Sequence, residues 1–145
     1  MTLASPTRAV RNANPGNLRH VAENAWSGLA DPPADDRSYC RFVEPKYGFR
    51  ALISLLRIYG KRHGLKTIAV IVPRFAPAAD GNNETAYIKD LEHLTEYDRQ
   101  KPLNFDDATE MQNLAHGIAM HESGGWFFET ADLEAGCALA FGTQE

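Results

Sequence analysis

Cysteine is scarce in this sequence, and basic residues are fewer than acidic ones. The 145 residues include 2 cysteines, Cys40 and Cys137, and 15 lysines and arginines against 19 aspartates and glutamates, a net charge of −4. Two thiols so far apart form no zinc-binding pair, and we expect both to be free, with a long-range disulfide as the alternative. An acidic chain without a dense basic stripe is a poor nucleic-acid binder, so we expect no nucleic-acid partner.

Long hydrophobic runs are also absent. The longest covers residues 67–72, which is too short to cross a bilayer. The first 14 residues contain no apolar segment of the kind found in secretory signals. We therefore expect no membrane insertion and synthesis in the cytoplasm. Work in the periplasm or cell wall then requires delivery by phage lysis, by a virion or by a secretion system. No metal-ligand or cofactor motif is present, so we expect neither a metal nor a cofactor.

The length and the 43% hydrophobic content are those of one globular domain, over residues 1–145, with residues 1–10 as a flexible segment. Hydrophobic spacing predicts a mainly helical (α+β) domain with one small β-hairpin. The expected helices cover residues 47–62, 68–72 (with a strand as the alternative), 82 or 83 to 94, 106–123 and 130–141, and the expected strand covers residues 38–43. Residues 14–17 (NPGN) form a tight turn in which Gly16 can take a positive φ.

The segment 118–125 (IAMHESGG) carries the strongest chemical pattern. Helical spacing places Glu122 on the same face as Ile118, so an apolar stripe ends in a carboxyl group at a helix C-terminus. The helix dipole and apolar neighbours such as Trp126 and Phe127 favour the protonated form, which a general acid needs. The alternative is a surface glutamate beside a Gly-Gly helix stop.

Several motifs carry a resemblance to known families. Glu122-Ser123-Gly124 at the end of an apolar helix looks like the catalytic Glu-Ser-Gly of lysozyme-like enzymes, the lytic transglycosylases and bacterial glucosaminidases. Residues 11–19 (RNANPGNLR) and 26–29 (WSGL) are similar to a phage and prophage family often labelled virion structural protein or lytic transglycosylase-like protein. Further blocks of that family are matched by residues 48–51 (GFRA), Ala76-Pro77, Asn82 and Tyr87-Ile88.

The order of these blocks is unusual. In the lysozyme-like enzymes the glutamate helix comes first, and the Asn-Gly turn, the hairpin and the tyrosine helix follow it. Here the turn comes first and Glu122 last, and no glutamate precedes Asn12. The resemblance therefore implies a lysozyme-like domain that is circularly permuted, which is physically reasonable because chain ends often lie close together.

The resemblance also implies roles for individual residues. Tyr87 would match the tyrosine that orients the catalytic acid, so Tyr87 and Glu122 are expected within hydrogen-bonding distance; the alternative is a core tyrosine. Five residues would line the cleft and bind substrate: Asn14, Gly16, Asn17, Trp26 and Asn82. The alternatives are pure turn chemistry for residues 14–17 and a core position for Trp26.

These resemblances imply an enzyme that cleaves the β-1,4 bond between N-acetylmuramic acid and N-acetylglucosamine in peptidoglycan. A hydrolase needs a second carboxylate, for which the loop offers Asp31, Asp35 and Asp36. A lytic transglycosylase uses one glutamate twice, which fits Glu122 with Tyr87 better. Two alternatives remain: a non-catalytic virion structural or peptidoglycan-binding protein, and an antibacterial cell-wall effector toxin. The expected partners are glycan strands and phage-particle or secretion-system components.

Overall fold

The computed structural model describes residues 6–21 and 23–142, which form a mainly helical fold with a two-stranded antiparallel sheet. The elements are α1 (Arg8–Arg11), β1 (Leu29–Ala30), β2 (Arg41–Phe42), α2 (Pro45–His63), α3 (Ile68–Phe75), the 3-10 helix η1 (Ala78–Asp80), α4 (Glu84–Thr95), α5 (Ala108–Ser123) and α6 (Thr130–Ala140). The expected helical class with a small hairpin is confirmed. Of the segment expected to be flexible, residues 1–5 lie outside the described residues, whereas α1 begins at Arg8 and buries Ala9 completely.

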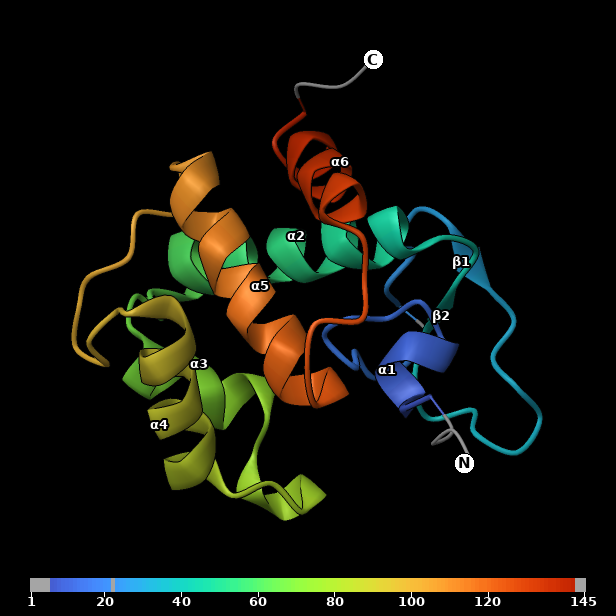
Figure 1. Cartoon of the computed structure of the whole chain (residues 1–145), viewed down its shortest axis with the longest axis horizontal. Helices are drawn as coiled ribbons and strands as arrows, with labels where there is room; N and C mark the ends of the chain where they lie inside the picture. The colour runs from blue at the N-terminus through green and yellow to red at the C-terminus, as the bar shows by residue number, and fades with distance from the viewer. Residues whose placement is uncertain (1–5, 22, 143–145) are drawn as a thin grey trace.

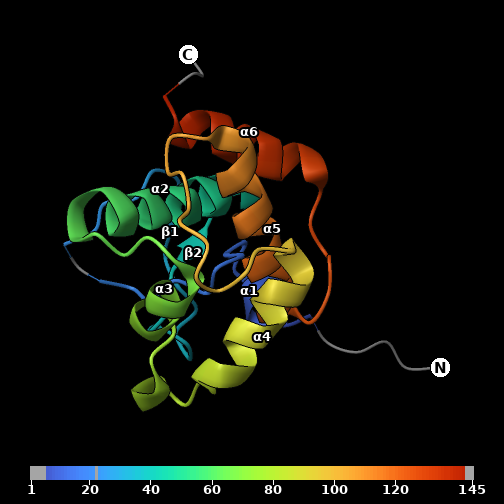
Figure 2. The same ribbon diagram turned by 90° about the vertical axis from the view of Figure 1, so that its left-hand side faces the viewer.

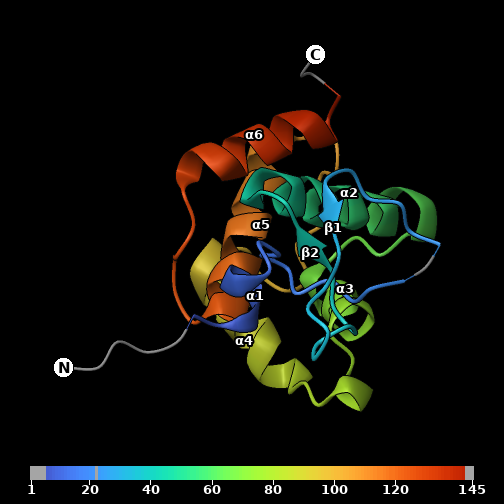
Figure 3. The ribbon, with the colours of Figure 1, turned by 90° about the vertical axis from the view of Figure 1, so that its right-hand side faces the viewer.

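Helix α5 lies in the middle of the molecule, and α1, α2, α4 and α6 all pack against it (Figure 1). Two side views show α6 lying along α2 at one end and α3 and α4 at the other (Figures 2 and 3). The buried residues of α5 recur at helical spacing and include Met111, Leu114, Ala115, Ile118 and Ala119. The C-terminal turn of α5, which carries Glu122, is therefore fixed by a helix that is packed on several sides.

Helix ends follow the expected capping chemistry at several positions. α2 ends at Gly64, which has the left-handed φ of 67°, and α5 ends at Gly124, with a φ of 75°. Asn83 is the N-cap of α4, and its side chain accepts a hydrogen bond from Ala86 N. Asp107 caps α5 in the same way through Glu110 N.

Other boundaries correct the sequence-based expectations. α3 does not end before Pro73 but continues to Phe75, and the strand alternative for residues 68–72 is wrong. Proline itself has a helical φ, and only two helical residues follow Pro73, so a single lost N–H donor is tolerated. α6 begins at Thr130, with Glu129 as its N-cap, and ends at Ala140, one residue before the expected end. Of the strand expected over residues 38–43, the structure has the two residues of β2, Arg41–Phe42.

The two thiols agree with the expectation that both cysteines are free. Cys40 and Cys137 are both free and buried, and burial raises the pKa of Cys40 to about 11. Their burial leaves both as small apolar side chains rather than reactive thiols. Within the described residues, no helix combines the length and apolar character needed to span a membrane.

The N-terminal turn packs directly on α2 at Gly48. A Cβ atom at this glycine would lie 2.2 Å from the backbone oxygen of Ala13 and 2.6 Å from Cδ of Pro15. Backbone atoms cannot move aside as a flexible side chain can, so α2 and the turn approach each other closely only because residue 48 has no side chain.

We expect Gly48→Ala to lower the free energy of unfolding by about 1–3 kcal/mol, the usual cost of overpacking. Helix propensity alone would change it in the opposite direction, by about 1 kcal/mol in favour of alanine. Urea denaturation followed by circular dichroism measures the difference. A Gly48→Ala protein as stable as the wild type, or more stable, would contradict the close approach.

Candidate active site

A cavity of about 430 Å³ contains Glu122 in its wall, together with side chains from the N-terminal segment, α2 and the segment between α3 and α4. Five of the seven predicted site residues line it: Gly16, Asn17, Trp26, Asn82 and Glu122. The other lining residues are Arg8, Leu18, Arg19, Val21, Asn24, Tyr39, Leu55, Tyr59, Arg74, Phe75, Ala76, Pro77 and Asp80. The remaining two predicted residues, Asn14 and Tyr87, are buried behind this surface.

The carboxyl group of Glu122 accepts one hydrogen bond on each oxygen. Asn17 Nδ2 donates to Oε1 at 2.8 Å, and the Tyr87 hydroxyl donates to Oε2 at 2.6 Å. The expected approach of Glu122 to Tyr87 is therefore present, and the turn of residues 14–17 contributes Asn17 to the same group. Two donors on opposite oxygens fix both the position and the plane of the carboxyl group.

Tyr87 acts from behind the cavity wall. Its side chain is 1% exposed, so it reaches the cavity only through Glu122. Burial raises the pKa of its hydroxyl well above the ordinary value, and the negative charge of Glu122, the hydrogen bond to Glu122 and the charge of Asp90 raise it further. The hydroxyl thus remains a hydrogen-bond donor at neutral and mildly alkaline pH.

His121 lies against the Tyr87 ring and is itself held by Asp90, and the sequence singled out neither residue. The His121 ring stacks on the Tyr87 ring with centroids 3.7 Å apart, and His121 Nδ1 lies 2.7 Å from Asp90 Oδ2. Asp90 is one helical turn beyond Tyr87 on α4, and His121 directly precedes Glu122 on α5. The sequence gives no direct indication of this group because it forms only where α4 docks on α5.

Asn17 has an unusual backbone conformation. Its φ is 47°, in the left-handed region, and its N–H bonds the backbone oxygen of Asn14 at 2.9 Å. Asparagine tolerates this region better than most residues. The expectation that Gly16 takes the positive φ is wrong, since Ala13 and Asn17 take it. A Cβ atom at position 16 would lie 2.8 Å from Leu52 Cδ1, so any other residue there would need the Leu52 side chain to shift.

Asn14, which was expected to bind substrate, does not line the cavity. It is fully buried, its Oδ1 accepts from Leu18 N at 2.9 Å, and its Nδ2 donates to the backbone oxygens of Leu18 and Cys40. These three bonds leave its amide no access to the cavity. Asn14 instead joins the turn to the strand region, which fixes the backbone that carries Asn17.

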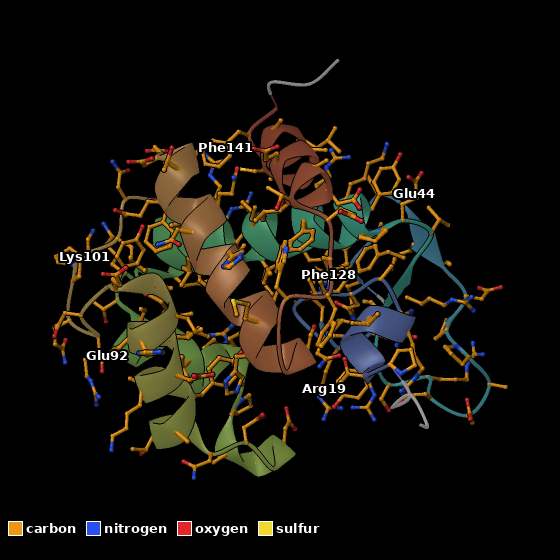
Figure 4. All side chains as sticks on the ribbon, viewed as in Figure 1. Arg19, Glu44, Glu92, Lys101, Phe128 and Phe141 are labelled. Carbon is orange, nitrogen blue, oxygen red and sulfur yellow. The ribbon has the colours of Figure 1, made fainter. Side chains whose placement is uncertain are left out.

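The second carboxylate in the cavity is Asp80, which the sequence did not indicate. Asp80 Oδ2 accepts from Nε of Arg19, labelled in Figure 4, at 3.2 Å. The loop residues Asp31, Asp35 and Asp36 do not line the cavity, and Asp36 instead pairs with Arg8 at 2.8 Å. The carboxylate that accompanies Glu122 in the cavity wall is therefore Asp80 of η1 and none of the three loop aspartates proposed from the sequence.

Aromatic and amide groups complete the wall. Trp26 is half-buried and packs against the core, yet it lines this cavity and a neighbouring one of about 220 Å³. Asn82 Nδ2 donates to the backbone oxygen of Pro77 at 3.2 Å, which leaves its carbonyl oxygen available. Among the residues that the structure describes, no cluster of three or more histidine, cysteine, aspartate or glutamate side chains is arranged to hold a metal ion.

Comparison with known proteins shows a similarity to a bacteriophage protein. No family model matches the sequence. The chain is 31% identical over 99 residues to Protein P5 of Pseudoalteromonas phage PM2, an alignment that spans 67% of this chain and 61% of the phage protein. The chain is thus similar to a bacteriophage protein over about three fifths of that protein's length.

The raised pKa of Tyr87 predicts a stability change at alkaline pH. Above the ordinary tyrosine pKa the unfolded chain loses this proton and the folded chain keeps it, so the Tyr87 contribution to stability falls as pH rises. The contribution should fall by about 1.4 kcal/mol per pH unit between the ordinary and the raised pKa. Urea denaturation between pH 8 and pH 11 should show a shallower alkaline decline in Tyr87→Phe than in the wild type. An equal alkaline loss of stability in the two proteins would contradict the raised pKa of Tyr87.

Proposed function

We propose that this protein cleaves the glycan strands of peptidoglycan, with Glu122 as general acid and base, in a lysozyme-like domain whose chain order is circularly permuted. One observation carries the proposal: the carboxyl group of Glu122 lies in the wall of a cavity, with each oxygen held by a neutral donor, Asn17 or Tyr87. A positioned carboxyl group beside a space of about 430 Å³ can exchange a proton with a bound sugar.

The type of donor supports proton transfer. Within the described part of the chain, Glu122 forms no ion pair, and both of its partners are uncharged. An adjacent guanidinium would favour the ionised carboxylate more strongly than an amide or a phenol does. A group that protonates a leaving oxygen and then accepts a proton has to use both protonation states within one reaction cycle.

The lining of the cavity fits a sugar chain. The indole ring of Trp26 offers a flat surface for the C–H face of a pyranose ring. The amides of Asn24 and Asn82 can bond hydroxyl or acetamido groups. A concave wall with a few polar groups and aromatic side chains is the usual form of a small-molecule site.

A single-acid reaction follows from these residues. Glu122 donates its proton to the glycosidic oxygen as the bond to C1 breaks. The resulting carboxylate then takes the proton of the C6 hydroxyl, whose oxygen bonds C1 to give a 1,6-anhydromuramic end. Asn17 and Tyr87 hold the carboxyl group in place through both steps. Asp80 is tied to Arg19, so it is less suited to activate a water molecule.

A non-catalytic role in a phage particle is the second candidate function, and the similarity to a phage protein agrees with it. A virion protein could use the same cavity to bind peptidoglycan without cleaving it. Binding alone needs Trp26 and the amide side chains but not proton exchange at Glu122. The two functions therefore differ in their dependence on Glu122.

We expect Glu122→Gln to reduce the clearing of purified sacculi at least about 100-fold, because glutamine keeps the shape but carries no transferable proton. Turbidity measures the rate, and thermal denaturation checks that the variant is folded. Glu134→Gln, at an exposed position on α6, is the matched control and should leave clearing unchanged. Wild-type clearing by Glu122→Gln would assign catalysis to another residue, and a wild type that binds sacculi without clearing them would favour the structural role.

The products distinguish the two cleavage chemistries. We expect mass spectrometry of digested sacculi to show 1,6-anhydromuramic ends, and Asp80→Asn to lower the rate less than about 10-fold. A hydrolase requires a second carboxylate for a water molecule and leaves reducing ends. Reducing ends together with a collapse of activity in Asp80→Asn would contradict the single-acid reaction.

A further inference from the structure

Three arginines line the cavity of a chain that is acidic overall, Arg8, Arg19 and Arg74. Two of them each form an ion pair and also lie over an aromatic ring. Arg8 pairs with Asp36 at 2.8 Å and Arg19 with Asp80 at 3.2 Å. Both guanidinium groups also lie over the Tyr39 ring, at 4.1 Å and 4.8 Å from its centroid. The charges and stacking faces of these two side chains are thus already matched by groups of the protein.

Arg74 differs from the other two arginines in its partners. Its guanidinium lies 5.6 Å from the centroid of Tyr59, a buried residue of α2. Among the described residues, no aspartate or glutamate pairs with it. Arg74 is placed at the last turn of α3, and the stacking on Tyr59 restricts where its guanidinium can lie. A planar guanidinium with free donors matches the geometry of a carboxylate, which it can bond with two N–H groups.

We propose that Arg74 binds a carboxylate of the substrate, and that the cavity therefore selects a glycan with an acidic branch over a neutral one. This inference rests on the proposed function, because the muramic acid units of peptidoglycan carry such groups and chitin does not. The carboxylate can belong to the lactyl group of muramic acid or to a peptide attached to it. Arg74 would then set the register of the chain, so that a defined glycosidic bond lies at Glu122.

Equilibrium binding tests the inference without turnover. In the Glu122→Gln protein, calorimetry compares four oligosaccharides: a muramic-acid-containing tetrasaccharide as the free acid, its methyl ester, its peptide-substituted form, and chitotetraose. We expect the free acid or the peptide-substituted form to bind about 10-fold more tightly than the ester, and Arg74→Ala to remove that difference. Which of the two binds more tightly identifies the source of the carboxylate.

Arg62→Ala is the matched control. Arg62 is exposed in the last turn of α2 and does not line the cavity, so its removal changes the net charge equally and should leave the preference intact. Equal binding of acid, peptide-substituted form and ester by the parent would overturn the inference, as would a preference that survives in Arg74→Ala. In either case binding of the glycans leaves the proposed function standing. If none of the four binds, the proposed function fails, and this inference fails with it.

Discussion

The carboxyl group of Glu122 is bonded by side chains from two distant parts of the chain, Asn17, 105 residues earlier, and Tyr87, 35 residues earlier. Both donors can reach it only if the N-terminal turn and α4 dock on the C-terminal end of α5. That docking also brings the cavity walls together, because the turn carries Gly16 and the segment before α4 carries Asn82. A single carboxyl group thus couples the positions of three segments.

The N-terminal turn has an irregular backbone that several contacts constrain. A non-glycine residue in the left-handed region costs of order 1 kcal/mol, and Ala13 and Asn17 both take it. The buried amide of Asn14 offsets this cost with three hydrogen bonds to backbone groups. Gly48 lets α2 approach the turn directly. The strained backbone is therefore held from both sides at the point where it presents Asn17.

Hydrophobic spacing and capping residues were sufficient to predict α2, α4, α5 and α6, because these signals are local. The prediction that Glu122 contacts Tyr87 rested on the resemblance to known motifs and not on hydrophobic spacing. The features that could not be predicted from the sequence depend on packing between distant segments. Asn14 is buried within the turn. Asp80 lines the cavity, where η1 lies beside Arg19. The stacking of His121 on Tyr87 likewise exists only where α4 and α5 meet.

The central claim is that a glycan lies in the cavity with its scissile oxygen at Glu122. A crystal structure of the Glu122→Gln protein with a bound muramic-acid-containing tetrasaccharide tests this most directly. The account predicts a glycosidic oxygen within hydrogen-bonding distance of the substituted side chain at position 122, about 2.6–3.2 Å, with a sugar ring against Trp26. A tetrasaccharide bound elsewhere on the protein, with the cavity empty, would contradict it.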